Sequence, residues 1–171
     1  GDQEKIDKII KPIYKTDTEQ SPMFYNSSTF DFNDLIPAPQ ELNDNYWRIN
    51  NWGTKWNGYN ATFVDNVLTF DTAWSFPEPV IRKLADLCYK NEITFDGIYA
   101  DEDVANNSGE FCCNDDTDGE LFIDYYDYCS NDAYDAYYKL HGFDCEKDID
   151  EFVDGEIAIA LKAAHKRVNE V

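Results

Sequence analysis

The chain has 171 residues, 43% of them hydrophobic, and a net charge of -21 from 35 acidic and 14 basic side chains. This size suits one hydrophobic core and argues for a single domain with some additions. No run approaches the roughly 18 apolar residues that span a bilayer, and no signal peptide pattern is present, so we expect a soluble cytoplasmic protein without membrane association.

An amphipathic helix is predicted near the start of the chain, over residues 4–14. Four isoleucines recur there at helical spacing: Ile6, Ile9, Ile10 and Ile13. Pro12 is expected to end or bend this helix. The following segment, Thr16 to Asn45, is rich in Ser, Pro, Asn and Asp, which favours an extended piece laid over the core rather than regular structure.

The middle of the chain predicts a turn, a strand and a capped helix. Gly53, within the tryptophan-rich residues 46–56, indicates a turn or a close backbone approach. Apolar and polar residues alternate over 67–74, as in a strand. Ser75 is the expected N-cap of a helix that runs to about Asn91, and Glu78 completes a Ser-x-x-Glu capping box.

Three further strands are predicted over residues 93–100, 109–113 and 120–128, as an antiparallel meander. Asp118 and Gly119 supply the turn between the last two. The alternation breaks at Tyr125 and Tyr126, which indicates a bulge or an exposed aromatic face.

Two helices are predicted after the meander. The first covers residues 131–140, with Ala133, Tyr137 and Leu140 on one side, and the second is a long C-terminal helix from about Ile149 to Val168. We therefore predict an α/β domain over residues 1–128 and a helical C-terminal extension over 129–171 that packs on it.

Three short words in the sequence are recognisable: IPAP at 36–39, NWGTKW at 51–56 and TAWSFPEP at 72–79. With them, residues 1–124 resemble the YubB-like ferredoxin-like-domain family of phage and plasmid proteins. The resemblance implies an α+β fold, a βαββαβ variant in which helices cover one face of an antiparallel sheet. It also implies a mobile-element origin, but it does not by itself imply an enzymatic activity. Past residue 124 the match is lost, and the acidic, helical C-terminal part is predicted to be an addition specific to this chain.

The chain departs from that family pattern at its start. A βαββαβ unit needs a strand before the first helix, and here the helix begins almost at Gly1. The strand is absent, supplied differently or trimmed.

The tryptophans of these words admit two interpretations. We expect Trp52, Trp56 and Trp74 to pack in the core, and the alternative is an aromatic cage for a ligand. Lys55 stands between two of them, so its ammonium is expected against an indole face or beside a carboxylate such as Asp71.

Catalytic and metal-binding patterns are weak. The five cysteines form no CxxC pair, and free thiols are favoured over disulfides or zinc. His141 and Cys145 share i, i+4 spacing without a complete ligand set. His165 lacks a motif, and no phosphate-binding glycine loop or HExxH is present. We predict no catalytic residues, no cofactor and no metal site.

Residues 114–120 partly fit a calcium-binding loop. Asn114, Asp116 and Asp118 occupy its positions one, three and five, but the twelfth position is Tyr125 where that loop needs a Glu. An acidic hairpin turn is therefore the favoured interpretation.

Most of the net charge lies in residues 96–154, which hold nineteen Asp and Glu against two basic side chains. Eleven aromatic residues in the same stretch favour a folded surface over a disordered tail. Three interpretations remain open: a solvated surface, a cation-binding site, and a decoy that occupies the nucleic-acid groove of a basic protein.

We favour the decoy, because carboxylates spread over a surface can compete for the Lys and Arg arrays that bind phosphates, and tyrosines can add interface contacts. The expected partner is a basic host protein that binds nucleic acid, such as a nuclease, restriction enzyme or CRISPR-type effector, and direct binding of nucleic acid is not expected. The alternatives are a metal-dependent phosphodiesterase or nucleotide-sequestering protein, and an accessory protein whose charge serves solubility. The predicted partner-binding residues are Asp101, Glu102, Asp103, Asp115, Asp116, Asp118, Asp124, Tyr125, Tyr126, Asp127, Tyr128, Asp132, Tyr134, Asp135 and Tyr138.

Overall fold

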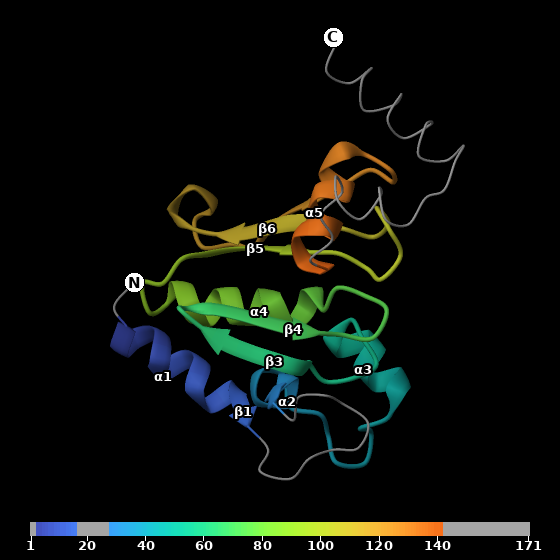
Figure 1. Cartoon of the computed structure of the whole chain (residues 1–171). Coiled ribbons are helices and arrows are strands. Elements are labelled where there is room, and N and C mark those ends of the chain that lie inside the picture. Colours follow the sequence, from blue (N-terminus) through green and yellow to red (C-terminus); the bar gives the residue numbers. More distant parts are fainter. Residues whose placement is uncertain (1–2, 17–27, 142–171) are drawn as a thin grey trace, which may run out of the picture.

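Helices and short strands alternate along the chain in the computed structural model, which describes residues 3–16 and 28–141 (Figure 1). The elements in chain order are α1 (Gln3–Ile13), β1 (Tyr14–Thr16), β2 (Ser28–Phe30), α2 (Phe32–Leu35), α3 (Asn45–Trp52), β3 (Tyr59–Val64), β4 (Val67–Asp71), α4 (Glu78–Tyr89), β5 (Phe95–Tyr99), β6 (Gly109–Cys113), the 3-10 turn η1 (Asp115–Thr117), β7 (Phe122–Tyr125) and α5 (Asn131–His141). The predicted α+β class with antiparallel strands is confirmed.

The strands of the described residues fall into three small antiparallel sheets, β1–β2, β3–β4 and β5–β6–β7. A bridge between Phe30 and Gly58 connects the first two. Helix α4 lies between the β3–β4 pair and the β5–β6–β7 sheet (Figure 1), so strands on its two sides do not pair.

The hydrophobic core surrounds α4. One stripe of this helix is buried: Val80, Ile81, Leu84, Ala85 and Cys88. The same core holds the buried isoleucines of α1, Phe30 and Phe32 from the N-terminal half, and Cys113 and Leu121 from the β6–β7 hairpin. Both predicted amphipathic helices are thus confirmed, with boundaries within two residues.

The predicted capping box at the start of α4 is wrong. The helix begins at Glu78, its N-cap is Pro77, and no side chain caps it. Ser75 instead donates its hydroxyl to the carbonyl oxygen of Gly53 at 2.6 Å. A contact with a distant segment therefore replaces the local cap.

Only one of the three tryptophans expected in the core is buried. Trp52 is 3% exposed, and its Nε1 donates to the carbonyl oxygen of Ile36 at 2.9 Å. Trp56 is 39% exposed and Trp74 is 69% exposed, so the prediction is wrong for both. Strand β4 ends at Asp71, and the left-handed backbone of Trp74 (φ 67°) turns its side chain away from the alternation.

The segment predicted to be irregular holds regular structure in its described part. Strand β2 pairs with β1, and Asp31 caps the short helix α2 by accepting from the backbone N–H of Asn33. Helix α3 begins after Asp44, whose side chain accepts from the backbone N–H of Trp47. The frequent Asn and Asp residues here act as helix caps, which composition alone presents as loop signals.

The antiparallel meander and the helix after it are confirmed. Strand β6 has the predicted bounds, and β7 ends at Tyr125, which is exposed, without a bulge at Tyr126. Helix α5 contacts β5 and β6, and its buried residues are Ala133 and Ala136. Leu140, expected on its buried side, is exposed. The predicted C-terminal helix, Cys145 and His165 lie outside the described residues.

Gly53 ends α3 in the left-handed conformation, with φ 82°. A Cβ at this position would lie 3.1 Å from Cδ of Pro79 and 3.2 Å from the carbonyl oxygen of Phe76. The predicted turn and close backbone approach are both confirmed.

We expect Gly53→Ala to lower the free energy of unfolding by about 1–3 kcal/mol, because the side chain meets both a strained backbone and a crowded contact. Urea unfolding followed by circular dichroism measures this loss. Asn50→Ala, on the exposed side of the same helix, is the control and should stay within about 0.5 kcal/mol of wild type. Equal stability of all three proteins would contradict the assignment.

Candidate functional site

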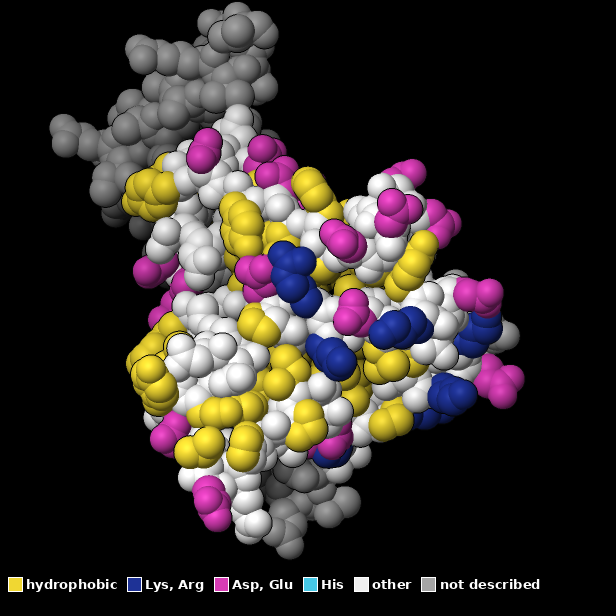
Figure 2. All heavy atoms as spheres, turned by 180° about the vertical axis from the view of Figure 1, so that it is seen from behind, with side chains coloured by type: hydrophobic (Ala, Val, Ile, Leu, Met, Phe, Trp, Pro, Cys, Tyr) yellow, Lys and Arg dark blue, Asp and Glu magenta, His cyan; other side chains and the backbone are white. Residues whose placement is uncertain are grey.

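Acidic side chains concentrate on the part of the molecule that holds β5, β6, β7 and α5. Residues 96–141 contain thirteen Asp and Glu and a single basic side chain, Lys139. In Figure 2 this upper part carries Asp and Glu side chains, whereas Lys and Arg gather across the middle and the lower part. The charge is therefore segregated by fold as well as by sequence.

The β5–β6–β7 sheet has one apolar face and one acidic face. Phe95, Phe111 and Cys113 point to the face that packs with the core around α4. The alternate residues of the same strands, Glu110 and Asp124 among them, point to the opposite face and are exposed. We call this opposite face the acidic face: its carboxylates are Asp96, Glu110 and Asp124, and Ile98, Cys112 and Phe122 point to the same side.

Two carboxylates stand directly opposite each other on the acidic face. Glu110 of β6 is the register partner of Asp124 of β7. Like charges in directly opposite positions destabilise a sheet. Sequence reasoning selected Asp124 but missed Asp96 and Glu110, although alternation in the predicted strands places both on the same side as Asp124.

Helix α5 brings a further carboxylate to this face. The pKa of Tyr126 is raised to about 12 by burial, by its hydrogen bond to Glu110, and by the charges of Glu110, Asp132 and Asp124. Asp132 lies in the first turn of α5. The structure thus brings together Asp124, Tyr126 and Asp132 from the predicted set.

A second acidic group lies at the end of the sheet where β5 ends and β6 begins. Asp101, Glu102 and Asp103 occupy the intervening loop, in which Asn107 donates to Asp101 at 3.1 Å. The pKa of Tyr128 is raised by its hydrogen bond to Cys129 and the charge on that residue, by burial, and by the charge of Asp103. Tyr128 therefore lies beside this loop.

A third acidic group lies at the other end of the sheet, on the β6–β7 hairpin: Asp115, Asp116 and Asp118. Asn114 caps the turn by accepting from the backbone N–H of Thr117 at 3.2 Å. Asp118 (φ 52°) and Gly119 (φ 78°) take left-handed conformations and form the predicted acidic turn. The Asn114 side chain therefore caps this turn, whereas in a calcium-binding loop it would be a ligand of the ion.

The predicted tyrosines do not form one surface. Tyr125 points to the core side of its strand, and its hydroxyl donates to Glu78 of α4 at 2.9 Å. Tyr134 and Tyr138 stack at 6.2 Å between ring centroids on α5. Asp127 and Asp135, the remaining predicted acids, are exposed.

The ion pairs of the described residues all lie elsewhere. They join Lys5 to Glu92, Lys11 to Asp7, Lys15 to Asp31 and Asp34, and Arg82 to Glu78. None of them involves a carboxylate from residues 96–141. The negative potential of the acidic face is therefore not neutralised by a basic side chain within the described part of the chain.

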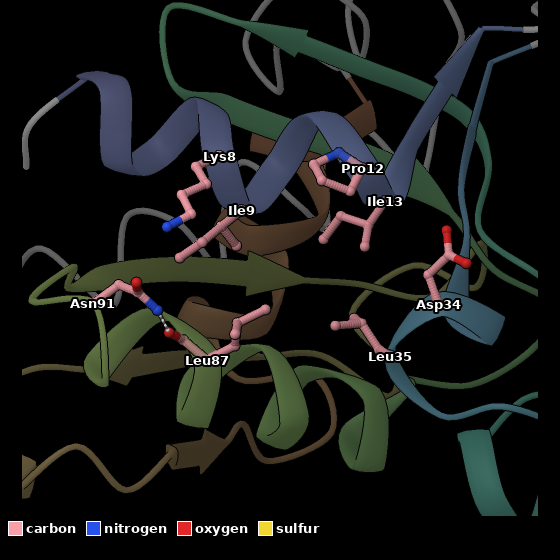
Figure 3. A pocket seen from close by; sticks show the side chains of 8 residues that line it. All are labelled: Lys8, Ile9, Pro12, Ile13, Asp34, Leu35, Leu87 and Asn91. Atoms are coloured by element: carbon pink, nitrogen blue, oxygen red, sulfur yellow. Dashed lines mark hydrogen bonds between the residues drawn. The ribbon is translucent and has the colours of Figure 1, made fainter.

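Two small pockets lie away from the acidic face. One, of about 260 Å³, is formed mainly by apolar side chains of α1, α2 and α4, including Ile9, Ile13, Leu35 and Leu87 (Figure 3). The other, of about 360 Å³, lies beside α3. Neither contains a predicted site residue. Within residues 3–16 and 28–141, no cluster of His, Cys, Asp and Glu is arranged to hold a metal ion.

The fold and the site define an α+β protein whose three-stranded sheet packs one face on α4 and carries exposed carboxylates on the other, which α5 also contacts. The family model for the ferredoxin-like domain in Api92-like protein matches residues 51–150, and the chain belongs to this family. The match includes NWGTKW and TAWSFPEP and extends beyond residue 124, into the region that sequence reasoning treated as specific to this chain. No curated protein and no solved structure matches the sequence.

None of the described helices is long and apolar enough to cross a bilayer.

We expect deprotonation of the Tyr126 hydroxyl to lower the free energy of unfolding at high pH. Its folded-state pKa of about 12 lies above the unfolded value of about 10, so its contribution is complete below pH 10 and is lost as pH rises toward 12. The urea concentration at the midpoint of unfolding should fall between pH 9 and pH 11, and this fall should be smaller for Tyr126→Phe than for wild type. Glu120→Gln, an exposed change on the hairpin, is the control and should match wild type. An identical fall in Tyr126→Phe would show that this hydroxyl is not held near carboxylates.

Proposed function

We propose that this chain is a non-enzymatic binding protein that inhibits a basic host defence protein by occupying its nucleic-acid site. The partner would be a nuclease, a restriction enzyme or a CRISPR-type effector. The observation that carries the proposal is the acidic face with its flanking loops, whose carboxylates, except the half-buried Asp101, are exposed, and none of which joins an ion pair among the described residues.

The layout of the carboxylates supports mimicry of a nucleic acid. Acidic groups lie at both ends of the sheet, and Glu110 and Asp124 lie between them. Five-residue strands at about 3.4 Å per residue separate the two ends by about 17 Å. Duplex DNA carries one charge per about 1.7 Å of its axis, and proteins bind it through matching arrays of Lys and Arg. An extended acidic surface competes for such an array.

The fold makes this surface rigid enough to act as a competitor. The inner side of the same sheet is packed on α4, and Arg82 of that helix donates to the carbonyl oxygen of Leu121 at 3.1 Å. Carboxylates on a packed sheet lose little conformational freedom on binding. Their field raises the association rate with a basic partner and is screened beyond about 8 Å at physiological ionic strength.

The resemblance to phage and plasmid proteins of the YubB-like family supports an origin in a mobile element, for which blocking host defence is useful. On this proposal the protein acts in the cytoplasm of a bacterial host. It does not bind nucleic acid itself, because a net charge of -21 opposes a polyanion.

We expect the protein, immobilised and exposed to host lysate at low salt, to retain basic proteins that bind nucleic acid, and added duplex DNA to release them. Changing Asp124, Asp127, Asp132 and Asp135 to Asn should weaken this capture at least tenfold and reduce its salt dependence. The matched control removes four exposed charges elsewhere, in Glu4→Gln, Glu41→Gln, Asp65→Asn and Asp86→Asn, and should retain most of the capture.

Three outcomes would contradict the proposal. Retention of no nucleic-acid-binding protein at low salt would exclude the decoy role. Equal loss in both quadruple variants would show that net charge alone attracts the partner. Turnover of cyclic or single-stranded nucleotides with added Mg²⁺ or Mn²⁺ would favour the phosphodiesterase instead.

A further inference from the structure

Trp74 is held on the surface by an unfavourable backbone. Its side chain is 69% exposed, and its φ of 67° lies in the left-handed region, which side-chain-bearing residues rarely adopt. The strained backbone and the exposed apolar side chain each lower the stability of the folded protein. Among the described non-glycine residues with positive φ, Trp74 is the one with a large apolar side chain, and strained positions of this kind cluster at functional sites.

Hydrogen bonds between two distant segments fix Trp74 in this position. Thr54 donates its hydroxyl to the carbonyl oxygen of Ala73 at 2.8 Å, in a buried contact. Ser75 donates to the carbonyl oxygen of Gly53 at 2.6 Å. These bonds join NWGTKW to TAWSFPEP on either side of Trp74, so the geometry of the exposed indole is specified by both words.

The exposed indole of Trp74 is the last of a row of neighbouring side chains. The ring centroids of Tyr59 and Trp56 lie 6.1 Å apart. The ammonium of Lys55 lies 4.5 Å from the centroid of Trp56 and 3.4 Å from that of Trp74. Lys55 therefore spaces the two indoles, and we call Lys55, Trp56 and Trp74 the tryptophan ledge.

Carboxylates lie next to the tryptophan ledge. Asp71 is the cross-strand partner of Tyr59 and stands three residues before Trp74. Asp71 and Glu102 both raise the pKa of Tyr59, after the larger effect of burial, so both lie close to that ring. Neither carboxylate joins one of the ion pairs of the described residues. Glu102 belongs to the acidic loop between β5 and β6.

We propose that the tryptophan ledge, with Asp71 and Glu102 beside it, is the docking site for an arginine side chain of the basic partner. The ammonium of Lys55 covers one face of Trp74, whose side chain is 69% exposed, so the incoming guanidinium would stack on the opposite face. A guanidinium stacks on an indole and pairs with a carboxylate at the same time, which an ammonium does less well. The inference rests on the proposed function, since it assigns an anchor to the same interface. Tryptophan is also among the residues that most often dominate interface energetics.

The charges of the chain disfavour the other occupants of the ledge. A second copy would bring another net charge of -21 to the interface. A single-stranded nucleic acid would stack on the indoles, but Lys55 is the only cation of the ledge and the neighbouring carboxylates repel phosphates. Self-association and binding of single-stranded DNA can both be measured with the same variants.

The test uses two synthetic peptides, nonaarginine and nonalysine, titrated calorimetrically into the full chain at low salt. Wild type should bind nonaarginine more tightly than nonalysine. Trp74→Gly should weaken nonaarginine binding at least about tenfold and abolish the preference. Because glycine accepts positive φ, this variant should keep or raise the thermal midpoint. Trp74→Phe should keep part of the preference. Tyr46→Ala removes an aromatic side chain that is 79% exposed on α3 and should change nothing.

The outcomes separate this inference from the proposed function. Binding of both peptides without preference, or a preference that Trp74→Gly retains, would overturn the docking site and leave the acidic surface in place. Binding of neither peptide would overturn both. Self-association, or binding of a short single-stranded DNA, that Trp74→Gly abolishes would assign the ledge to that occupant instead. A large fall in the thermal midpoint of Trp74→Gly would show that Trp74 serves stability.

Discussion

Helix α4 has to satisfy packing partners on two sides, and the rest of the structure follows from this constraint. Its buried stripe shares one core with the N-terminal phenylalanines and with Cys113 and Leu121 of the β6–β7 hairpin. The Cys113 thiol also contacts the carbonyl oxygen of Ala85 at 3.8 Å. Because the inner side of the three-stranded sheet is committed to this helix, the alternate side chains of the same strands must face away from the core. The position of α4 thus decides which side of the sheet carries Asp96, Glu110 and Asp124.

Periodicity predicted most of the elements that build this arrangement. The isoleucines of α1, the apolar stripe of α4 and the bounds of β6 followed from sequence because local pattern and tertiary packing agree there. The prediction failed at Ser75 and Trp74, because hydrogen bonds to Gly53 and from Thr54 decide their geometry. Those partners lie about twenty residues earlier in the chain, and rules such as the capping box and strand alternation consider only neighbouring residues.

The candidate site was predicted in kind but not in arrangement. Composition placed the negative charge in the right part of the chain, and every predicted acid except the half-buried Asp101 is exposed. Composition could not say which side chains share a face, since that depends on strand register. Register brings Glu110 opposite Asp124 and sends Tyr125 to the core side, toward Glu78. The site therefore gained a missed carboxylate and lost a predicted tyrosine for the same geometric reason.

The two surfaces proposed to bind a partner are both unfavourable for the isolated chain. Glu110 and Asp124 repel each other across a strand pair, and Trp74 exposes its indole from a strained backbone. Replacing one of these carboxylates with lysine would remove the repulsion, and replacing Trp74 with glycine would relieve the backbone strain. A basic partner removes both penalties, since its cations neutralise the carboxylates and its side chains cover the indole. If the proposed complex forms, it would relieve both penalties at once, and the acidic face and the tryptophan ledge would then share one explanation.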